Sequence, residues 1–322
     1  MAAHLFRRLG VSLLLLFLVL SLTFGLLHLA PGDPILLLGD PRVSPEQRDR
    51  IRELYGLDRS LSEQYLRWLG GVALAGEWGV SFSHQRPVTR VLADALPHTA
   101  VLGLAALLVQ FGVGLLVGAA SARRPGSPTD HALRIVSLLL YSLPIFWLGL
   151  MALLLFSHLL PLFPPGHLAA VDASRLPPLA RLADRLHHLA LPALVLGLAF
   201  SGAVGRFARN SLLDVLGQDY IRTARAKGVG EARVLWVHGL RNAAPPLVHL
   251  LGLSLPFLLS GALVTEVVFS WPGVGRVAYG AVLARDYPLV LGSTVLAATL
   301  VIAGSFAADL LHAAVDPRVR RG

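Results

Sequence analysis

The chain has 322 residues, of which 55% are hydrophobic and 15% charged, and its formal net charge at pH 7 is +9. This composition leaves too little polar surface for a water-soluble globule of this length and indicates a membrane protein. The sequence contains no cysteine, which excludes disulfides, thiolate metal ligands and cysteine nucleophiles.

Six apolar runs are each long enough to cross the hydrocarbon core of a bilayer, which takes about 20 residues of helix. Charged residues are rare inside these runs and cluster between them. The sequence therefore predicts an all-α polytopic membrane protein with six transmembrane helices. The predicted spans are residues 9–30, 99–120, 135–160, 189–207, 247–267 and 289–311.

Basic residues are distributed as in a multi-pass protein with both ends in the cytoplasm. Arg7 and Arg8 precede the first run, and a dense basic group from Arg206 to Arg241 separates the fourth and fifth runs. Because short basic loops stay on the cytoplasmic side, both termini are expected there, in a bacterial or archaeal inner membrane. The net charge is then a topology signal, and nucleic-acid binding is not expected.

The first run is interpreted as an uncleaved anchor. A secretory signal has a core of about 7–15 apolar residues and a small residue three places before the cut, whereas this run is longer and has His28 there. The predicted parts are an anchor (1–30), an external cap (31–97), a five-helix core (98–313) that includes a cytoplasmic loop (208–245), and a cytoplasmic tail (314–322).

The external cap is predicted to carry one short amphipathic helix. Ser44 and Gln47 are placed to form a capping box around Pro45, and Gly56 is a plausible end for the helix. Apolar residues follow at helical spacing, at Ile51, Leu54 and Tyr55. A small packed cap over the pore mouth is favoured over a substrate-reading site.

The cytoplasmic loop between the fourth and fifth runs has more internal order than a connection needs. Gly228 is expected to end a first, amphipathic helix, and a second short helix is expected to start near Glu231. The predicted apolar face of the first helix consists of Leu213, Leu216, Tyr220 and Ala224. Basic residues cover the remainder, so the loop is either an interfacial helix that fixes topology or a docking surface.

The motifs of this loop resemble those of a known family. The segment Asp219-Tyr220-Ile221-Arg222-Thr223-Ala224-Arg225-Ala226-Lys227-Gly228, followed by His238-Gly239-Leu240-Arg241-Asn242-Ala243, resembles the signature loop of ABC importer permeases of the dipeptide, oligopeptide and nickel branch. Further matches follow in the expected order, including Ala30-Pro31-Gly32-Asp33-Pro34, Leu143-Pro144-Ile145-Phe146-Trp147-Leu148-Gly149 and Glu266-Val267-Val268-Phe269-Ser270-Trp271-Pro272-Gly273.

This resemblance implies a type I ABC importer permease fold and a coupling helix seated on a separate ATPase subunit. The implied coupling residues are Asp219, Tyr220, Arg222, Thr223, Ala224, Arg225, Ala226, Lys227 and Gly228. The general family signature begins Glu-Ala-Ala where this chain has Arg222-Thr223-Ala224, a variant usual in the peptide branch. The ATPase-side contact of Arg222 therefore stays open.

The same resemblance implies a set of partners and a class of cargo. The partners are a second similar permease, two ABC ATPase subunits that carry ATP and Mg²⁺, and an extracytoplasmic substrate-binding protein. The cargo would be a dipeptide, an oligopeptide or another peptide-like solute, with a nickel chelate as a further option. A secondary transporter driven by an ion gradient is the alternative, disfavoured by the scarcity of ionisable residues within the spans.

Neither a nucleotide site nor an enzyme active site is expected in this chain. A phosphate-binding P-loop needs Gly-Lys followed by Ser or Thr, but Lys227 is the only lysine and Gly228 follows it. His187 and His188 are adjacent rather than at the spacing of a helical metal site, so no metal or cofactor is expected.

Two further groups are candidate functional residues. Glu266, Phe269 and Trp271 lie at the external end of the fifth run as a candidate gate or receptor contact, the alternative being a structural pair of Glu266 with an external arginine, Arg276 or Arg285. Pro144, Phe146, Trp147 and Pro256 are candidates for the pathway or for helix kinks. Gln110 and His249 are expected to form helix-to-helix hydrogen bonds.

Overall fold

The computed structural model describes residues 2–29, 46, 50, 52–53, 56–259 and 263–315. The described residues are helical apart from turns and one isolated antiparallel bridge between Val80 and Pro87. This confirms the all-α class. The chain forms two compact units, unit 1 from Met1–His98 with Gly273–Leu300 and unit 2 from Thr99–Pro272 with Val301–Gly322.

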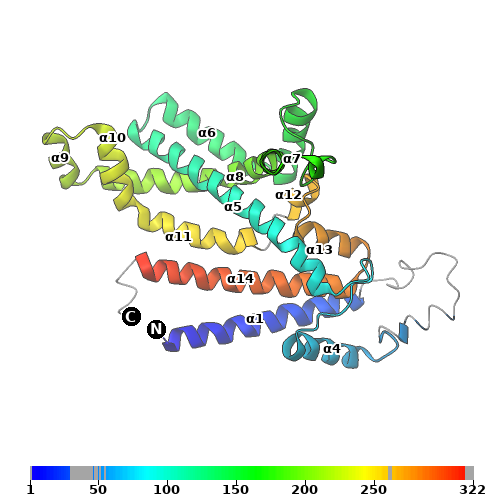
Figure 1. The fold of residues 1–322 in the computed structure, drawn as a ribbon. Helices are drawn as coiled ribbons and strands as arrows, with labels where there is room; N and C mark the ends of the chain where they lie inside the picture. The colour runs from blue at the N-terminus through cyan, green and yellow to red at the C-terminus, as the bar shows by residue number, and fades with distance from the viewer. Residues whose placement is uncertain are drawn as a thin grey trace. The chain divides into compact units, whose positions relative to one another are not determined.

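Unit 1 contains the N-terminal helix and the elements that follow it. They are α1 (Ala2–Leu29), α4 (Leu61–Gly70), the π-helical turn η1 (Gly71–Ala75), the beginning of α5 (Val88–Arg123), α13 (Val274–Leu283) and the beginning of α14 (Tyr287–Val315). Figure 1 labels the α-helices among them. Its core joins the start of α5 to α13 and α14. The buried members are Val88, Val91, Leu92, Ala95, Val274, Ala281 and Leu289.

A buried carboxylate fixes the turn before α5 to the start of α14. Asp286 is fully buried and accepts hydrogen bonds from Ser81 Oγ at 2.6 Å, Ser83 Oγ at 2.7 Å and Ser83 N at 2.9 Å. Its other oxygen accepts from Leu289 N at 3.2 Å. These four hydrogen bonds compensate the cost of burying the charged carboxylate, so Asp286 holds the turn before α5 against the start of α14.

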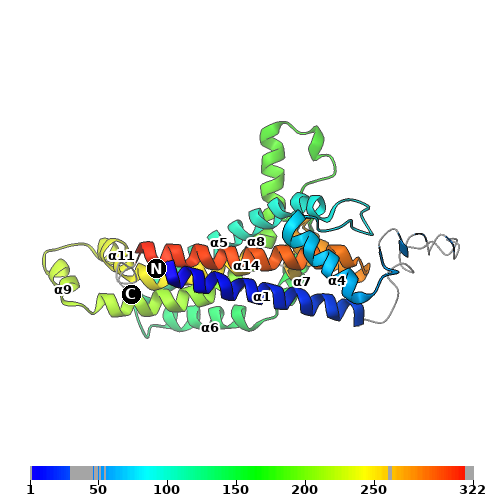
Figure 2. The same ribbon diagram turned by 90° about the horizontal axis from the view of Figure 1, so that it is seen from below.

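Unit 2 contains the remaining helices. They are the rest of α5, α6 (Pro128–Ser142), α7 (Ile145–Leu153), η2 (Leu154–Leu159), η3 (Ala173–Arg175), α8 (Pro178–Leu216), α9 (Asp219–Ala226), α10 (Glu231–Arg233), η4 (Val234–Gly239), α11 (Leu240–Leu259), α12 (Leu263–Val268) and the end of α14. The first turns of α8, with η3, stand away from the rest of unit 2 in Figure 2.

Small residues let α5 approach α8 closely. A Cβ atom added to Gly118 would lie 2.5 Å from Ala208 Cβ and 2.8 Å from the carbonyl oxygen of Gly205. One added to Gly114 would lie 2.5 Å from Val204 Cβ. Close backbone approach through small residues is the usual basis of helix packing in membranes, so α8 is the central helix of unit 2.

The predicted spans are recovered in most cases. Among the described residues, four helices are long and apolar enough to cross a membrane: Arg7–Leu29, Val88–Arg123, Pro178–Leu216 and Tyr287–Ala308. The third predicted run forms a pair, Pro128–Ser142 and Ile145–Leu159, bent by 102° at Pro144. The chain is thus broken rather than kinked within one helix: α6 ends at Ser142, and Pro144, which lacks an amide hydrogen, caps the start of α7.

The fifth predicted run is α11 followed by α12, with residues 260–262 between them outside the described residues. Pro256 lies in α11, but its side chain is also outside that part. Also outside the described residues are the cap residues 44–45, 47, 51, 54 and 55, the motif at 30–34 and residues 316–322 of the tail. Gly56 has φ +66, which suits the predicted helix end.

Candidate functional site

The loop after α8 forms two helices and a turn, rather than one amphipathic helix running from Leu213 to Ala224. α8 ends at Leu216 and α9 begins at Asp219. Gln218 between them is extended, with φ −76° and ψ 152°, and so interrupts the helix. The predicted single apolar face through Leu216 and Tyr220 is wrong for this reason. α9 lies at the end of the loop in Figure 1.

The predicted helix end at Gly228 is confirmed. Gly228 has φ +78, and its amide donates to Arg225 O at 2.9 Å while the amide of Val229 donates to Ala224 O at 3.2 Å. This pair of bonds is a Schellman motif, in which the residue after the cap takes the left-handed conformation that glycine adopts without strain. The angle at which the chain leaves α9 is thereby fixed.

One side chain anchors α9. Ile221 is fully buried, whereas Tyr220 on the predicted apolar face is 44% exposed. The Tyr220 hydroxyl instead accepts a hydrogen bond from Asn242 Nδ2 at 2.8 Å. Sequence reasoning missed Ile221, although it is the only large aliphatic residue between Asp219 and Gly228 and could have been identified on that ground.

The charged residues of α9 divide into two groups. Arg225 Nε and Nη2 donate to the carboxylate of Glu231 at 2.8 and 3.2 Å, which ties α9 to α10. This hydrogen-bonded guanidinium holds the pKa of Glu231 below its ordinary value. Arg222 is far more exposed, at 75%, and makes only a long pair with Asp219 at 3.3 Å. Arg222 and Lys227 therefore supply most of the outward positive charge of α9.

The base of this loop is apolar and continuous with the helices of unit 2. Leu212 of α8 is fully buried with Ala119 and Ala122 of α5 and Ala243 of α11. α9 packs on η4, and the amide of Leu240 bonds to Leu235 O at the end of η4. A force on α9 would thus reach α8 and α11 through packed side chains.

A buried ion pair joins α8 to α6 a short distance along the chain from this loop. Arg209 donates to both carboxylate oxygens of Asp130, at 3.0 and 2.8 Å. The Asp130 side chain is 0% exposed and also accepts from the amide of Gly126 at 2.9 Å. The first turn of α6 is therefore held rigidly against α8.

The residues proposed for a gate are buried. Glu266 is 0% exposed and accepts a hydrogen bond from Thr99 Oγ1 at 2.7 Å, while Phe269 and Trp271 are each 1% exposed. The carbonyl oxygen of Phe269 accepts from the amide of His167 at 2.9 Å, which lays the loop after η2 over this group. The three residues come together in the structure, but their role as a gate or receptor contact stays a prediction.

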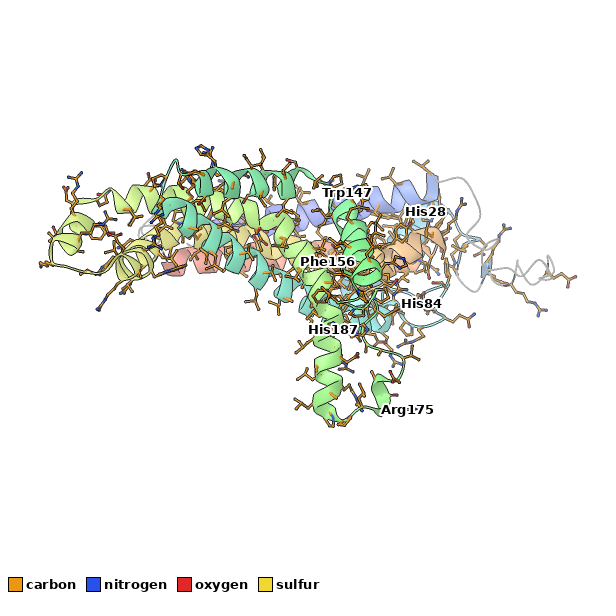
Figure 3. All side chains as sticks on the ribbon, turned by 90° about the horizontal axis from the view of Figure 1, so that it is seen from above. His28, His84, Trp147, Phe156, Arg175 and His187 are labelled. Atoms are coloured by element: carbon orange, nitrogen blue, oxygen red, sulfur yellow. The ribbon has the colours of Figure 1, made fainter. Side chains whose placement is uncertain are left out.

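The residues around Pro144 lie at the surface of unit 2. Phe146 and Trp147 are 51% and 42% exposed, and Figure 3 shows Trp147 at one end of α7. Gln110 Nε2 lies 3.5 Å from Ser254 Oγ, as expected of a hydrogen bond between two helices. Within the part of the chain that the structure describes, no group of three or more metal-ligating side chains occurs.

Comparisons with known proteins agree with these features. The family model "Binding-protein-dependent transport system inner membrane component" matches residues 114–321, and its N-terminal companion, "Binding-prot-dependent transport system membrane comp, N-term", matches residues 1–103. The chain is similar to the oligopeptide transport system permease protein AppB of Bacillus subtilis, with 39% identity over 99% of both chains. It is also similar to the dipeptide permease DppB of Escherichia coli, with 37% identity over 99% of both chains.

Among solved structures, the chain resembles one from inward-facing MetNI methionine ABC transporter crystals. The TM-score is 0.52 at 20% identity, covering 71% of this chain and 97% of that one. A second crystal form of the same transporter gives a TM-score of 0.55 at 19% identity. At this identity the likeness concerns the fold alone.

Proposed function

This chain belongs to the family of binding-protein-dependent transport system inner membrane components, and we propose that it forms half of the translocation pathway of an ATP-driven importer of peptide-like solutes. The cargo class is supported by the names of its relatives, which are permeases for oligopeptides, dipeptides and, in Pseudomonas aeruginosa, di- and tripeptides. The other half of the pathway is a second, similar permease.

The observation that carries the proposal is the architecture of α9. It is a short exposed helix anchored by Ile221, ended by Gly228 and tied to α10 by Arg225 and Glu231. Such an element is stiff and presents Arg222 and Lys227 outward. A stiff cationic helix suits a protein partner whose conformational change moves it, since charged hydrogen bonds are strong and can be broken and formed again.

ATP and Mg²⁺ belong to the ATPase partners in this scheme. When the ATPases close, α9 moves with them, and the packed cluster around Leu212 passes the movement to α8. The Arg209–Asp130 pair then carries α6 along with α8, so that the bundle moves as a body rather than helix by helix. The chain itself supplies half of the pathway and the helix, α9, that transmits the movement.

The protein is a multi-pass component of the inner membrane. We place both termini in the cytoplasm, which sets α9 on the side where ATP is available. The external ends of α1 and α14, and the loop over Phe269, then face an arriving substrate-binding protein. This orientation is supported by the basic loop from Arg206 to Arg241.

The test is reconstitution of the chain with its co-expressed partners, followed by affinity purification and uptake of a labelled tripeptide into proteoliposomes. The variant Arg222→Glu with Lys227→Glu reverses the outward charge of α9 and leaves the Arg225–Glu231 pair intact. It is expected to lose both the co-purified ATPase and ATP-dependent uptake. The control, Arg124→Glu with Arg134→Glu, makes the same charge change just after α5 and in the second turn of α6, positions that are also expected on the cytoplasmic side, and should retain both.

Two results would contradict the proposal. One is full ATPase recovery and uptake in the Arg222→Glu, Lys227→Glu variant. The other is uptake by the wild-type chain alone, driven by an ion gradient without any ATPase, which would assign a secondary transporter.

A further inference from the structure

A cavity in unit 1 lies where two membrane helices reach the same end. Its volume is about 390 Å³, within the range of small-molecule sites. Phe24 and His28 line it from the last two turns of α1, and Tyr287 and Pro288 line it from the first turn of α14. The rings of His28 and Tyr287 are 5.4 Å apart. The cavity therefore lies at the level where spans meet the polar headgroups of a bilayer.

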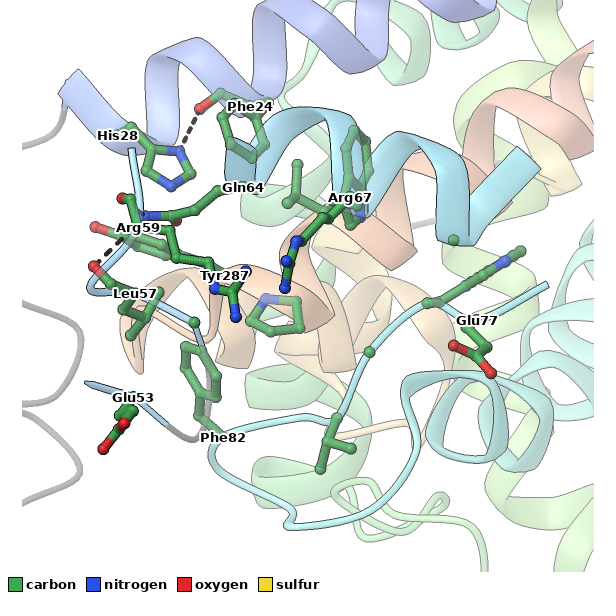
Figure 4. Close-up of a pocket in the computed structure, with 18 residues that line it drawn as sticks. Phe24, His28, Glu53, Leu57, Arg59, Gln64, Arg67, Glu77, Phe82 and Tyr287 are labelled. Atoms are coloured by element: carbon green, nitrogen blue, oxygen red, sulfur yellow. Dashed lines mark hydrogen bonds between the residues drawn. The ribbon is translucent and has the colours of Figure 1, made fainter. Parts of the chain in front are cut away.

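The walls of the cavity combine aromatic rings with charged groups. Trp68 of α4 stacks on Phe24 with a centroid distance of 5.8 Å, and Phe24 stacks on His28 at 4.1 Å. Arg59 and Arg67 also line the cavity, and Figure 4 shows both guanidinium groups pointing into its middle. An aromatic lining with a few convergent polar groups is typical of a ligand site rather than of a packing defect.

The two arginines carry more positive charge than their common partner neutralises. Arg59 Nη1 and Arg67 Nη2 both contact the same oxygen of Glu63, at 2.7 and 3.1 Å. One carboxylate between two guanidiniums leaves a net charge of one, and each guanidinium has further N–H donors in a planar fork. That fork matches the geometry of phosphate and carboxylate oxygens.

Carboxylates flank the arginine pair. Glu53 and Glu77 line the cavity on opposite sides of Arg59 and Arg67 in Figure 4. A ligand that fits the arginine pair and one flanking carboxylate is zwitterionic, with an anionic group at the arginines and an ammonium group close by.

A buried donor without a partner also belongs to this wall. Trp68 Nε1 is buried and has no hydrogen-bond partner among the described residues. A buried unpaired N–H costs free energy, so its presence calls for an acceptor beyond those that the described residues supply. A phosphate or ester oxygen in the cavity, with a small turn of the ring, would be such an acceptor.

The least packed span borders the cavity. Only 11% of the membrane window of α1 is buried within the chain, and Leu13 and Phe17, which lie on the same side of the helix as His28, are 54% and 45% exposed. Acyl chains can therefore lie along α1 while a headgroup enters beside His28. A soluble peptide gains little from an adjacent apolar helix surface, which favours a lipid over cargo as the ligand.

We propose that this cavity binds the headgroup of a zwitterionic phospholipid, with its phosphodiester on Arg59 and Arg67 and its ammonium group beside one of the two flanking carboxylates, Glu53 or Glu77. Phosphatidylethanolamine has this chemistry, and its bound headgroup would hold α4 against the ends of α1 and α14. The inference rests on the membrane location of the chain alone, so failure of peptide transport would leave it standing.

The test uses the purified full chain in detergent, titrated with short-chain phosphatidylethanolamine and read by mass spectrometry of the intact protein. The variant Arg59→Gln with Arg67→Gln is expected to bind the lipid at least about tenfold more weakly, since each lost charged contact is worth a kcal/mol or more. The control, Arg86→Gln with Arg90→Gln, removes two exposed charges of the same unit outside the cavity and should bind as the wild type does.

A second variant separates the site from general damage. Trp68→Phe keeps a ring on Phe24 and removes the unpaired N–H, so it is expected to weaken lipid binding without lowering the melting temperature. Equal lipid binding by all variants and the wild type would overturn the proposal. So would displacement of the lipid by inorganic phosphate alone, which would make free phosphate the ligand. Arginine-dependent binding of a labelled dipeptide in place of the lipid would assign the cavity to cargo.

Discussion

Arg209 of α8 donates to both carboxylate oxygens of Asp130 in the first turn of α6, with bond lengths of 3.0 and 2.8 Å. The Asp130 side chain is 0% exposed and that of Arg209 only 19%. A bidentate pair with so little access to water has few ways to rearrange, so it joins the two helices as one body.

Asp130→Asn should destabilise the protein by about 3 kcal/mol, because removing one partner leaves the guanidinium of Arg209 buried and uncompensated. Thermal unfolding in detergent measures the change. Asp94→Asn serves as the control, since the Arg86–Asp94 pair is 2.8 Å long but its side chains are 52% and 65% exposed. An equal loss of stability in both variants would mean that the buried pair contributes no more than the exposed one.

Gly228→Val should uncouple transport from ATP hydrolysis while leaving membrane insertion intact. A Cβ at Gly228 meets nothing within 4 Å, so the cost is that of the left-handed backbone alone, about 1–2 kcal/mol. Gly230→Val is the matched control, because Gly230 also has open space but φ −63°. The ratio of peptide transported to ATP hydrolysed is the measurement, and equal ratios in the two variants would refute the role of the Gly228 turn.

Glu231→Gln should loosen α9 from α10, seen as faster amide hydrogen exchange within α9. Because Arg225 lowers the pKa of Glu231 in the folded protein, the link is complete at neutral pH. It is lost only as the pH falls through that lowered pKa, so mildly acidic buffer should not reproduce the effect of the variant. Exchanging the charges, Arg225→Glu with Glu231→Arg, should restore protection. Failure of that exchange to do so would argue against the pair.

Gly118→Ala should destabilise unit 2 by about 1–3 kcal/mol, because the added methyl would overlap Ala208 and the Gly205 carbonyl oxygen and force α5 away from α8. Gly112→Ala on the same helix meets nothing within 4 Å and should be neutral or slightly stabilising. Melting temperatures of the two variants in the same detergent decide the matter; a loss at Gly112 equal to that at Gly118 would exclude close packing as the cause.

Hydropathy alone locates most of the membrane helices of this chain. α1, α5, α8 and α14 each contain a predicted span, and Pro144 marks the break between α6 and α7. The boundaries are less well predicted: α8 extends from Pro178 to Leu216, well past the predicted span of 189–207 at both ends. Polar residues continue the helix there. At its start, Asp184 and Arg181 form hydrogen bonds with the backbone of the preceding loop, which a hydropathy average does not detect.

The loop after α8 could be predicted in its helix boundaries but not in its contacts. Gly228 and Glu231 mark a helix end and a helix start by local chemistry that is visible in the sequence. The pairing of Arg225 with Glu231 depends on the turn between them, and periodicity alone placed Arg225 among the basic residues that cover the rest of the helix surface. For Glu266 a structural pair with Arg276 or Arg285 was the alternative to a gate or receptor contact, and one partner that the structure gives it is Thr99, far away in sequence.

The π-helical segment η4 sets the rotational phase of α11. At its end the amide of Leu240 bonds to the carbonyl five residues back, so η4 holds one residue more than a regular α-helical turn. The wide turn absorbs this extra residue, which in a regular helix would rotate everything after it by about 100°. Loss of one residue between Val234 and Gly239 should therefore leave the side of α11 that faces α8 nearly unchanged, whereas the same loss from a regular part of α11 should turn the rest of the helix away.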